Sequence, residues 1–204
     1  IADVGDVLTG GDLIACLNHP NKWVRQRATL ELGWRGDATA VKTLILLIEK
    51  GSLEALWAIN LLNELSDERA EKWLQSPHAD IRRWVTRLLG DQHRSHESLV
   101  NVAQNEPNVQ VRSQLAATAK RVDAKVALPI IRALLANDAD TTDPHMPLMI
   151  WWAIESHSDA WTEIEAMLRD QRVWNLPIFR DHIASRLMQR YAAGGSPSEL
   201  QHCA

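Results

Sequence analysis

The chain has 204 residues, of which 46% are hydrophobic, and its 22 basic and 26 acidic side chains give a formal charge of −4. A chain of this size can bury a core without disulfides or metal ions, and Cys16 and Cys203 do not suggest a disulfide framework. The acidic balance argues against a dedicated nucleic-acid binder. No apolar run reaches the roughly 18–20 residues that a membrane-spanning helix needs. Because the chain opens on Ile1 without a methionine, we expect it to be part of a longer protein.

Three segments share one pattern, in which a proline stands five residues before an arginine and a Val or Ile directly precedes that arginine. The segments are HPNKWVRQRA (19–28), SPHADIRRWV (76–85) and EPNVQVRSQL (106–115). The proline and arginine pairs are Pro20 and Arg25, Pro77 and Arg82, and Pro107 and Arg112. A motif that recurs in this form indicates an internal repeat.

The spacing of the pattern predicts further copies. Val24 and Ile81 are 57 residues apart, whereas Ile81 and Val111 are 30 apart, so another copy should lie midway through the first gap. Leu53 in GSLEALWAINLL occupies that place, and copies around Leu148 and Phe179 follow. Six units of about 30 residues therefore account for nearly the whole chain.

Each unit has helical periodicity. Ile81, Val85 and Leu88 share one face, and no stretch alternates convincingly as a strand would. We therefore expect an all-α fold of twelve helices in six antiparallel pairs, A followed by B, because one pair cannot bury its apolar face alone. The expected B helices cover residues 21–34, 51–65, 78–90, 107–121, 147–157 and 175–193.

Prolines and capping residues mark the expected helix starts. Pro20, Pro77 and Pro107 should lie in the first turn of their B helices, where a missing N–H costs nothing. The A helices should begin at residues suited to capping. These are Asp37, Ser66, Asp123 and Ser158. We expect residues 1–10 to be a linker, 11–193 the repeat domain and 194–204 a flexible tail.

The period, the Pro-x-x-x-[Val/Ile]-Arg opening and the paired helices resemble HEAT repeats of the short form. This resemblance covers roughly residues 11–193 and implies an α-solenoid, or superhelix, of about six hairpins. The copies at Leu53, Leu148 and Phe179 lack the full proline and arginine signature.

A narrower resemblance is carried by HPNKWVRQRA, RRWVTRLLGD and DPHMPLMIWWAIE. These segments are similar to the HEAT part of large planctomycete and verrucomicrobial proteins described as membrane-bound dehydrogenases. In that family a sugar-dehydrogenase-like domain precedes the helical part and a haem-binding cytochrome c domain follows it. The resemblance implies that this chain is the connector and that it lies outside the cytoplasm near a membrane. The chain has no Cys-x-x-Cys-His, and QHCA at its end does not match a haem attachment site.

The segment DPHMPLMIWWAIE, residues 143–155, is the most unusual in composition. Asp143 and Met146 each precede a proline and should be extended, so the helix is expected to begin at Pro147. Trp151 and Trp152 point about 100° apart on a helix, so one should pack in the core and the other at its margin.

The polar loop 136–146 before this helix is a candidate binding loop, with His145 as a candidate contact or loop brace. Asp138, Asp140 and Asp143 resemble a calcium loop, but Asp143 and Met149 occupy the positions of the required glycine and glutamate.

Other residue groups favour structural roles. His93 and His96 in DQHRSHE have the residue types of a metal site, but they lack the regular spacing that fixes ligand geometry, and a solvated loop is favoured. Cys16 lies among apolar residues that would bury it. We therefore predict no catalytic residue, metal or cofactor in this chain.

Charge separates the B helices from the rest. They contain twelve basic against six acidic residues, and the remainder contains ten against twenty. In solenoids of the family that the chain resembles, the B helices line the concave side, so an acidic partner is expected there. We assign Arg25, Arg82 and Arg112 to bracing between units. The candidates for partner contact are Arg83, Arg87, His145, Trp151 and Trp152.

Two functions from different classes remain open. The first is a non-catalytic scaffold, interaction or spacer module, whose partners are neighbouring domains or an acidic protein surface, without nucleic acid and without direct membrane insertion. The second is an enzyme similar to the HEAT-like DNA glycosylases that remove alkylated bases. Nine tryptophans and the basic B helices favour it, whereas the overall acidity counts against it.

Overall fold

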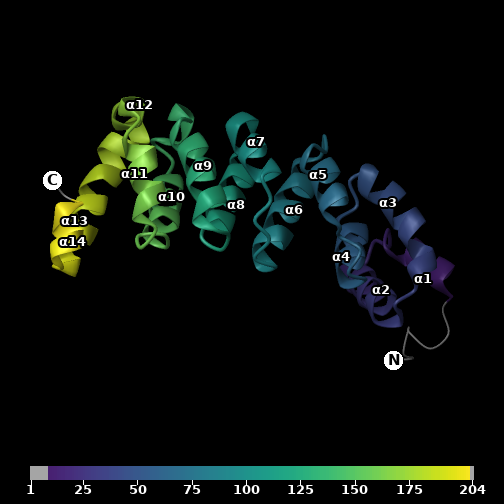
Figure 1. Cartoon of the computed structure of the whole chain (residues 1–204). Helices are drawn as coiled ribbons and strands as arrows, with labels where there is room; N and C mark the ends of the chain where they lie inside the picture. Colours follow the sequence, from purple (N-terminus) through teal and green to yellow (C-terminus); the bar gives the residue numbers. More distant parts are fainter. Residues whose placement is uncertain (1–8, 203–204) are drawn as a thin grey trace. The chain divides into compact units, whose positions relative to one another are not determined.

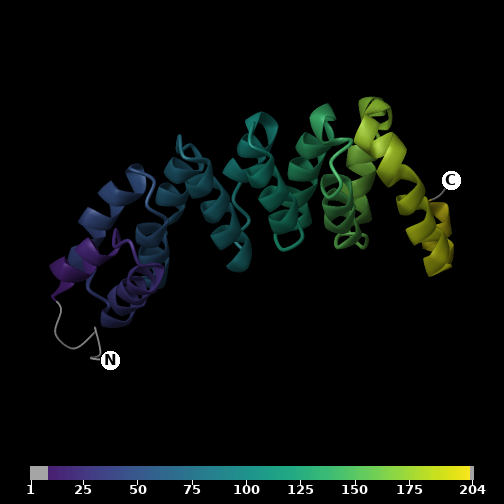
Figure 2. The same cartoon turned by 180° about the vertical axis from the view of Figure 1, so that it is seen from behind.

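The computed structural model describes residues 9–202, and these are all α-helical apart from turns and short 3-10 and π segments, with no strand among them. The chain divides into a first compact unit, Ile1–Val85, and a second, Thr86–Ala204. Within each unit the helices are arranged in space in the order of the sequence (Figures 1 and 2). Within this described stretch no helix is long and apolar enough to cross a membrane.

The first unit is built from helical hairpins. Its helices are α1 (Gly10–Cys16), α2 (Lys22–Arg35), α3 (Val41–Glu49), α4 (Leu53–Leu61), α5 (Asp67–Leu74) and the start of α6 (Ala79–Asp91). Helix α2 contacts both its hairpin partner α1 and the next B helix, α4, and α3 contacts α4. Leu13, Leu44 and Ile59 are fully buried between these helices.

The second unit continues the same order. Its helices are α7 (Ser98–Asn105), α8 (Val109–Ala119), α9 (Ala124–Leu135), α10 (Met146–Glu155), α11 (Trp161–Leu168), α12 (Gln171–Asn175), α13 (Ala184–Gly194) and α14 (Pro197–Gln201). The A helices α7, α9 and α11 contact one another in sequence, as do the B helices α8 and α10. This A-on-A and B-on-B packing is the arrangement expected where helical pairs stack.

Five of the six expected B helices coincide with α2, α4, α6, α8 and α10 to within a few residues. The sixth B helix, expected at residues 175–193, differs from the structure in its first turn. Leu176 is extended because it precedes Pro177, and the following helix passes through a π turn at Phe179–Ile183 before α13. The expected number of twelve helices was also too small, since the described residues contain fourteen α-helices.

The expected helix starts were partly wrong. Pro20 and Pro107 do not lie in the first helical turn, because the following residues, Asn21 and Asn108, are the N-caps and accept backbone N–H groups with their side chains. Pro77 likewise precedes α6, which begins at Ala79. The prolines therefore belong to the turn between the A and B helices.

Among the A helices, Ser66 caps α5 and Asp123 precedes α9. Ser158 does not begin a helix, since α11 starts at Trp161. The backbone carbonyl of Ser158 instead accepts a hydrogen bond from the Tyr191 hydroxyl at 2.9 Å.

Residues 1–8 of the expected linker lie outside the described residues. The first described helix, α1, begins at Gly10, and a capping box between Thr9 and Asp12 closes its first turn. The expected flexible tail contains α14, closed by a capping box between Ser196 and Glu199. The Ser-x-x-Glu spacing that forms this second box is visible in the sequence.

Candidate partner-binding surface

The arginine that recurs in the sequence motif binds the turn before three of the B helices, α2, α6 and α8. Nη1 of Arg112 donates to the backbone carbonyl of Glu106 at 3.0 Å and to that of Pro107 at 2.8 Å. Nε and Nη2 of Arg112 contact the two carboxylate oxygens of Asp140, each at 2.6 Å. Hydrogen bonding to Asp140 raises the pKa of Arg112 above its ordinary value. Arg112 therefore joins the turn before α8 to the loop between α9 and α10.

Arg25 makes the same set of contacts in the first unit. Its Nη1 donates to the carbonyls of His19 at 2.9 Å and Pro20 at 3.1 Å, and its Nε contacts Glu54 at 2.6 Å. Arg82 donates to the carbonyl of Ser76 at 2.8 Å. These arginine side chains bind carbonyl groups of the protein's own backbone, so they are not candidates for partner contact.

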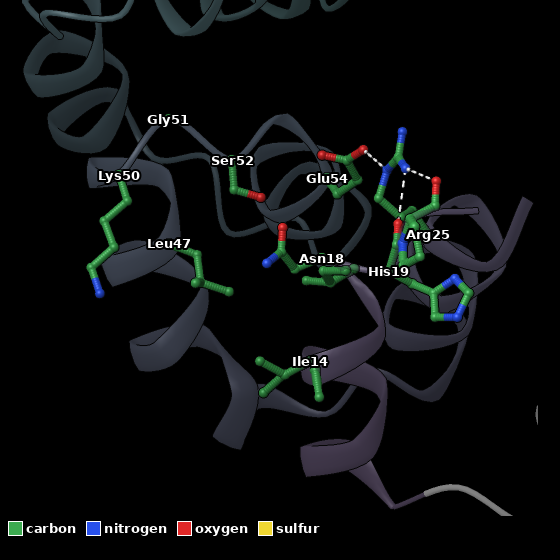
Figure 3. Close-up of a pocket in the computed structure, with 12 residues that line it drawn as sticks. Ile14, Asn18, His19, Arg25, Leu47, Lys50, Gly51, Ser52 and Glu54 are labelled. Carbon is green, nitrogen blue, oxygen red and sulfur yellow. Dashed lines mark hydrogen bonds and ion pairs between the residues drawn. The ribbon is translucent and has the colours of Figure 1, made fainter. Parts of the chain in front are cut away.

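A pocket of about 890 Å³ lies beside Arg25 in the first unit (Figure 3). It is bounded by the end of α1, the end of α3 and the first residues of α4, and Ile14 and Leu47 supply part of its apolar wall. Arg25 and Glu54 face each other across one rim and neutralise one another. Lys50 also lines this pocket, which contains none of the residues predicted for partner contact.

A shallow pocket of about 470 Å³ lies between α6 and α8 of the second unit. Its lining residues are Arg87, Gln114, Ala117, Lys120 and Arg121. Three of these five side chains are cations, so the pocket, named here the cation pocket, favours an anionic group.

Asp91 contacts two of the cations that line the pocket. Asp91 contacts Arg121, and its other carboxylate oxygen lies 3.4 Å from Nε of Arg87. Lys120 places its ammonium 5.6 Å from the ring centroid of Trp152. Two of the three cations thus share the carboxylate of Asp91, and an aromatic face borders the third.

Close packing of α6 on α8 forms the base of this pocket. The hydroxyl of Thr118 donates to the backbone carbonyl of Thr86 at 2.9 Å. A β-carbon added to Gly90 would lie only 2.8 Å from the same hydroxyl, so the glycine is what allows the two helices to approach. The pocket therefore rests on rigid helices and not on a loop.

The structure brings together two of the five residues predicted for partner contact. Arg87 lines the cation pocket, and Trp152, 44% exposed, borders it through Lys120. Trp151 is buried at 8% exposure and packs in the core. Arg83 belongs to the first unit and lies 3.0 Å from Asp80.

His145 stands apart from this pair. It precedes α10 and is exposed, about 10 Å along the helix from Trp152 at 1.5 Å per residue. Sequence reasoning missed Lys120 and Arg121, although two adjacent cations at the end of an expected B helix were visible.

The carboxylates of Asp140 and Asp143, in the loop before α10, bind other groups of the protein. Asp140 is buried against Arg112. Asp143 accepts the backbone N–H groups of His145 and Met146, each at 2.8 Å, and these bonds lower its pKa below the ordinary value. The expectation of an extended Met146 was wrong, because α10 begins there, one residue before Pro147.

The histidine pair in the α6–α7 loop also has backbone partners. His93 adopts a positive φ of 53° and its Nδ1 lies 2.9 Å from the carbonyl oxygen of Arg121. Nδ1 of His96 accepts the N–H of Ser98 at 3.3 Å. No group of three or more candidate metal ligands occurs in residues 9–202.

Comparison with known proteins does not add to this geometry. No family model, curated protein or solved structure matches the chain. The function must therefore be argued from the arrangement of its residues.

Proposed function

We propose that the chain is an α-solenoid of HEAT-like hairpins that serves as a scaffold or spacer in a larger protein and holds an acidic protein partner on its B helices. The repeat is supported at the level of single contacts. Arg25 and Arg112 occupy the same motif position and each binds two turn carbonyls and one carboxylate. Stacked helical pairs with such braces form an extended surface suited to binding.

The observation that carries the partner proposal is the cation pocket with Trp152 at its edge. An acidic side chain of a partner would meet three cations there, and an adjacent apolar side chain would meet the exposed indole. A protein partner is favoured over nucleic acid because the chain as a whole is acidic and Asp91 lies among the cations. By the narrower family resemblance, we propose that the larger protein is a redox protein in which this chain connects a sugar-dehydrogenase-like domain to a haem-binding cytochrome c domain.

Binding of an acidic peptide tests the partner proposal. The probe is a fluorescent peptide of eight glutamates and one phenylalanine, and the variant is Lys120→Glu. Reversing this charge should weaken binding by about tenfold or more, which corresponds to about 1.4 kcal/mol. Lys125→Glu is the matched control, because Lys125 is an exposed cation of the same unit on the A helix α9. Equal weakening by both variants would contradict a specific site.

A duplex DNA competitor separates the two classes of function. Displacement of the peptide by DNA, with a steep salt dependence, would favour a DNA-directed enzyme over a protein scaffold. Small-angle scattering tests the solenoid itself. A compact globule of this length would have a radius of gyration of about 17 Å, and the proposal requires a clearly larger value.

A further inference from the structure

Helix α2 leaves a row of large apolar side chains exposed in the first unit. Trp23, Leu30 and Trp34 are 54%, 38% and 64% exposed. They are seven and four residues apart, so they lie on one side of an α-helix. Single exposed apolar side chains are ordinary, but a row on one face of a helix marks an interaction surface.

The row continues onto the neighbouring helix α4. Leu61 of α4 is 41% exposed. A β-carbon added to Gly33 of α2 would lie 2.5 Å from the β-carbon of Leu61, so Leu61 rests directly against the α2 backbone. Helices α2 and α4 are direct neighbours in both views of the chain (Figures 1 and 2). Trp23, Leu30, Trp34 and Leu61 are named here the α2–α4 apolar surface.

Helix α2 carries an excess of positive charge. Helix α2 contains Lys22, Arg25, Arg27 and Arg35, and Glu31 is the one acidic residue in its sequence. Glu31 is only 8% exposed and is held by Arg27 at 2.7 Å and Arg35 at 3.7 Å. The guanidinium of Arg27 lies 5.1 Å from the ring centroid of Trp34. A partner therefore meets apolar side chains on a helix with a net positive charge, in which Glu31 offsets part of the charge of Arg27 and Arg35.

We propose that the α2–α4 apolar surface docks an amphipathic helix of an acidic protein partner. The row from Trp23 to Trp34 is about 16 Å long at 1.5 Å per residue, which matches about three turns of a partner helix. The apolar face of that helix would cover the indoles and the leucines, and its acidic flank would face Lys22 and Arg35. The inference rests on the proposed scaffold function, and it specifies the form of the partner.

The test uses a designed helical peptide of sixteen residues with leucines at helical spacing and glutamates elsewhere. The control is a peptide of the same composition in which the leucines are scattered around the helix. We expect the amphipathic peptide to bind at least tenfold more tightly than the scattered one in calorimetry. In protein labelled with 5-fluorotryptophan, the fluorine resonances of Trp23 and Trp34 should shift on binding.

Two variants on the protein locate the site. Leu30→Ser on α2 should weaken peptide binding at least fivefold, whereas Leu46→Ser should have no effect. Leu46 is the matched control because it is 53% exposed in the same unit but lies on the A helix α3. Leu30 is 38% and Leu46 53% exposed, so melting curves of both variants are needed to show that each one folds.

Three results would overturn the inference: no saturable binding of the amphipathic peptide, equal binding of the scattered peptide, or equal effects of the two leucine variants. Self-association is a further outcome. If sedimentation shows a dimer that Leu30→Ser abolishes, the occupant is a second copy of this chain and the proposal is wrong. The Lys120→Glu variant keeps the two proposals apart, since weakened binding of the glutamate-rich probe there supports the cation pocket whatever the α2–α4 apolar surface does.

Discussion

Arg112 and Asp140 form a two-point ion pair that joins α8 to the loop before α10, with both nitrogen–oxygen distances at 2.6 Å. Their side chains are only 7% and 3% exposed. Removing one partner leaves the other charge buried and unpaired, which typically costs about 3–5 kcal/mol. We expect Asp140→Ala to lower the free energy of unfolding by that amount, as measured by urea denaturation.

The equivalent pair in the first unit is the control. Arg25 and Glu54 are 27% and 19% exposed, so water screens them more. Glu54→Ala should therefore cost about 1 kcal/mol or less. If both substitutions cost the same, burial does not decide the strength of the arginine brace.

The free energy of unfolding should depend on pH through Asp143, which lies just before α10. The backbone N–H groups of His145, and next of Met146, hold its pKa below the ordinary value of 3.8. Because the folded-state pKa is the lower one, the carboxylate contributes stability that is fully present above about pH 4 and is lost as the pH falls through the folded-state pKa. Unfolding by urea at a series of acidic pH values should show a steeper loss for the native chain than for Asp143→Asn. Parallel losses would show that this carboxylate does not contribute.

The sequence predicted the B helices well because their signals are local. A turn proline, an asparagine and a helical apolar period occur within a dozen residues of α2 and α8, and the recurring arginine marks the same turn. Pro20 and Pro107 were predicted to lie in the first helical turn, but each lies two residues before the first helical residue. The N-caps are instead Asn21 and Asn108, whose side-chain oxygens accept backbone N–H groups of the first turn.

The candidate site was predictable only in part. Arg87 and Trp152 lie on B helices that the repeat spacing located, but Lys120 joins them because α8 contacts α6 through Thr118 and Thr86 and also contacts α10. Helical geometry alone predicted that one of Trp151 and Trp152 is buried and the other is exposed, because adjacent residues point about 100° apart. The set of cations that share the pocket depends on how closely α6 approaches α8. Gly90 allows this close approach, and the hydrophobic periodicity of the sequence does not indicate it.

Trp57 and Trp84 meet edge to face in the first unit, with ring centroids 4.9 Å apart and planes at 73°. Trp84 is half-buried, so Trp84→Ala should cost less than the about 3–5 kcal/mol typical of a core tryptophan. A double-mutant cycle with Trp57→Ala should give a coupling energy of about 0.5–1.5 kcal/mol. Additive losses would mean that the two rings touch without stabilising one another.

Gly90 is the position where one added methyl group should disturb both stability and the cation pocket. A β-carbon there would lie 2.8 Å from Oγ1 and 2.9 Å from Cγ2 of Thr118, and 3.1 Å from Nη2 of Arg121. Gly90→Ala must therefore push α6 away from α8, at a cost of about 1–3 kcal/mol, and should weaken binding of the glutamate-rich peptide. Gly11→Ala is the control, because its β-carbon would meet only Oγ1 of Thr9 at 3.8 Å. Since alanine favours a helix over glycine by about 0.5–1 kcal/mol, this control should be neutral or stabilising and leave peptide binding unchanged. A Gly90→Ala chain as stable as the control would show that α6 and α8 can separate freely, and the cation pocket would then lack the rigid base on which its selectivity depends.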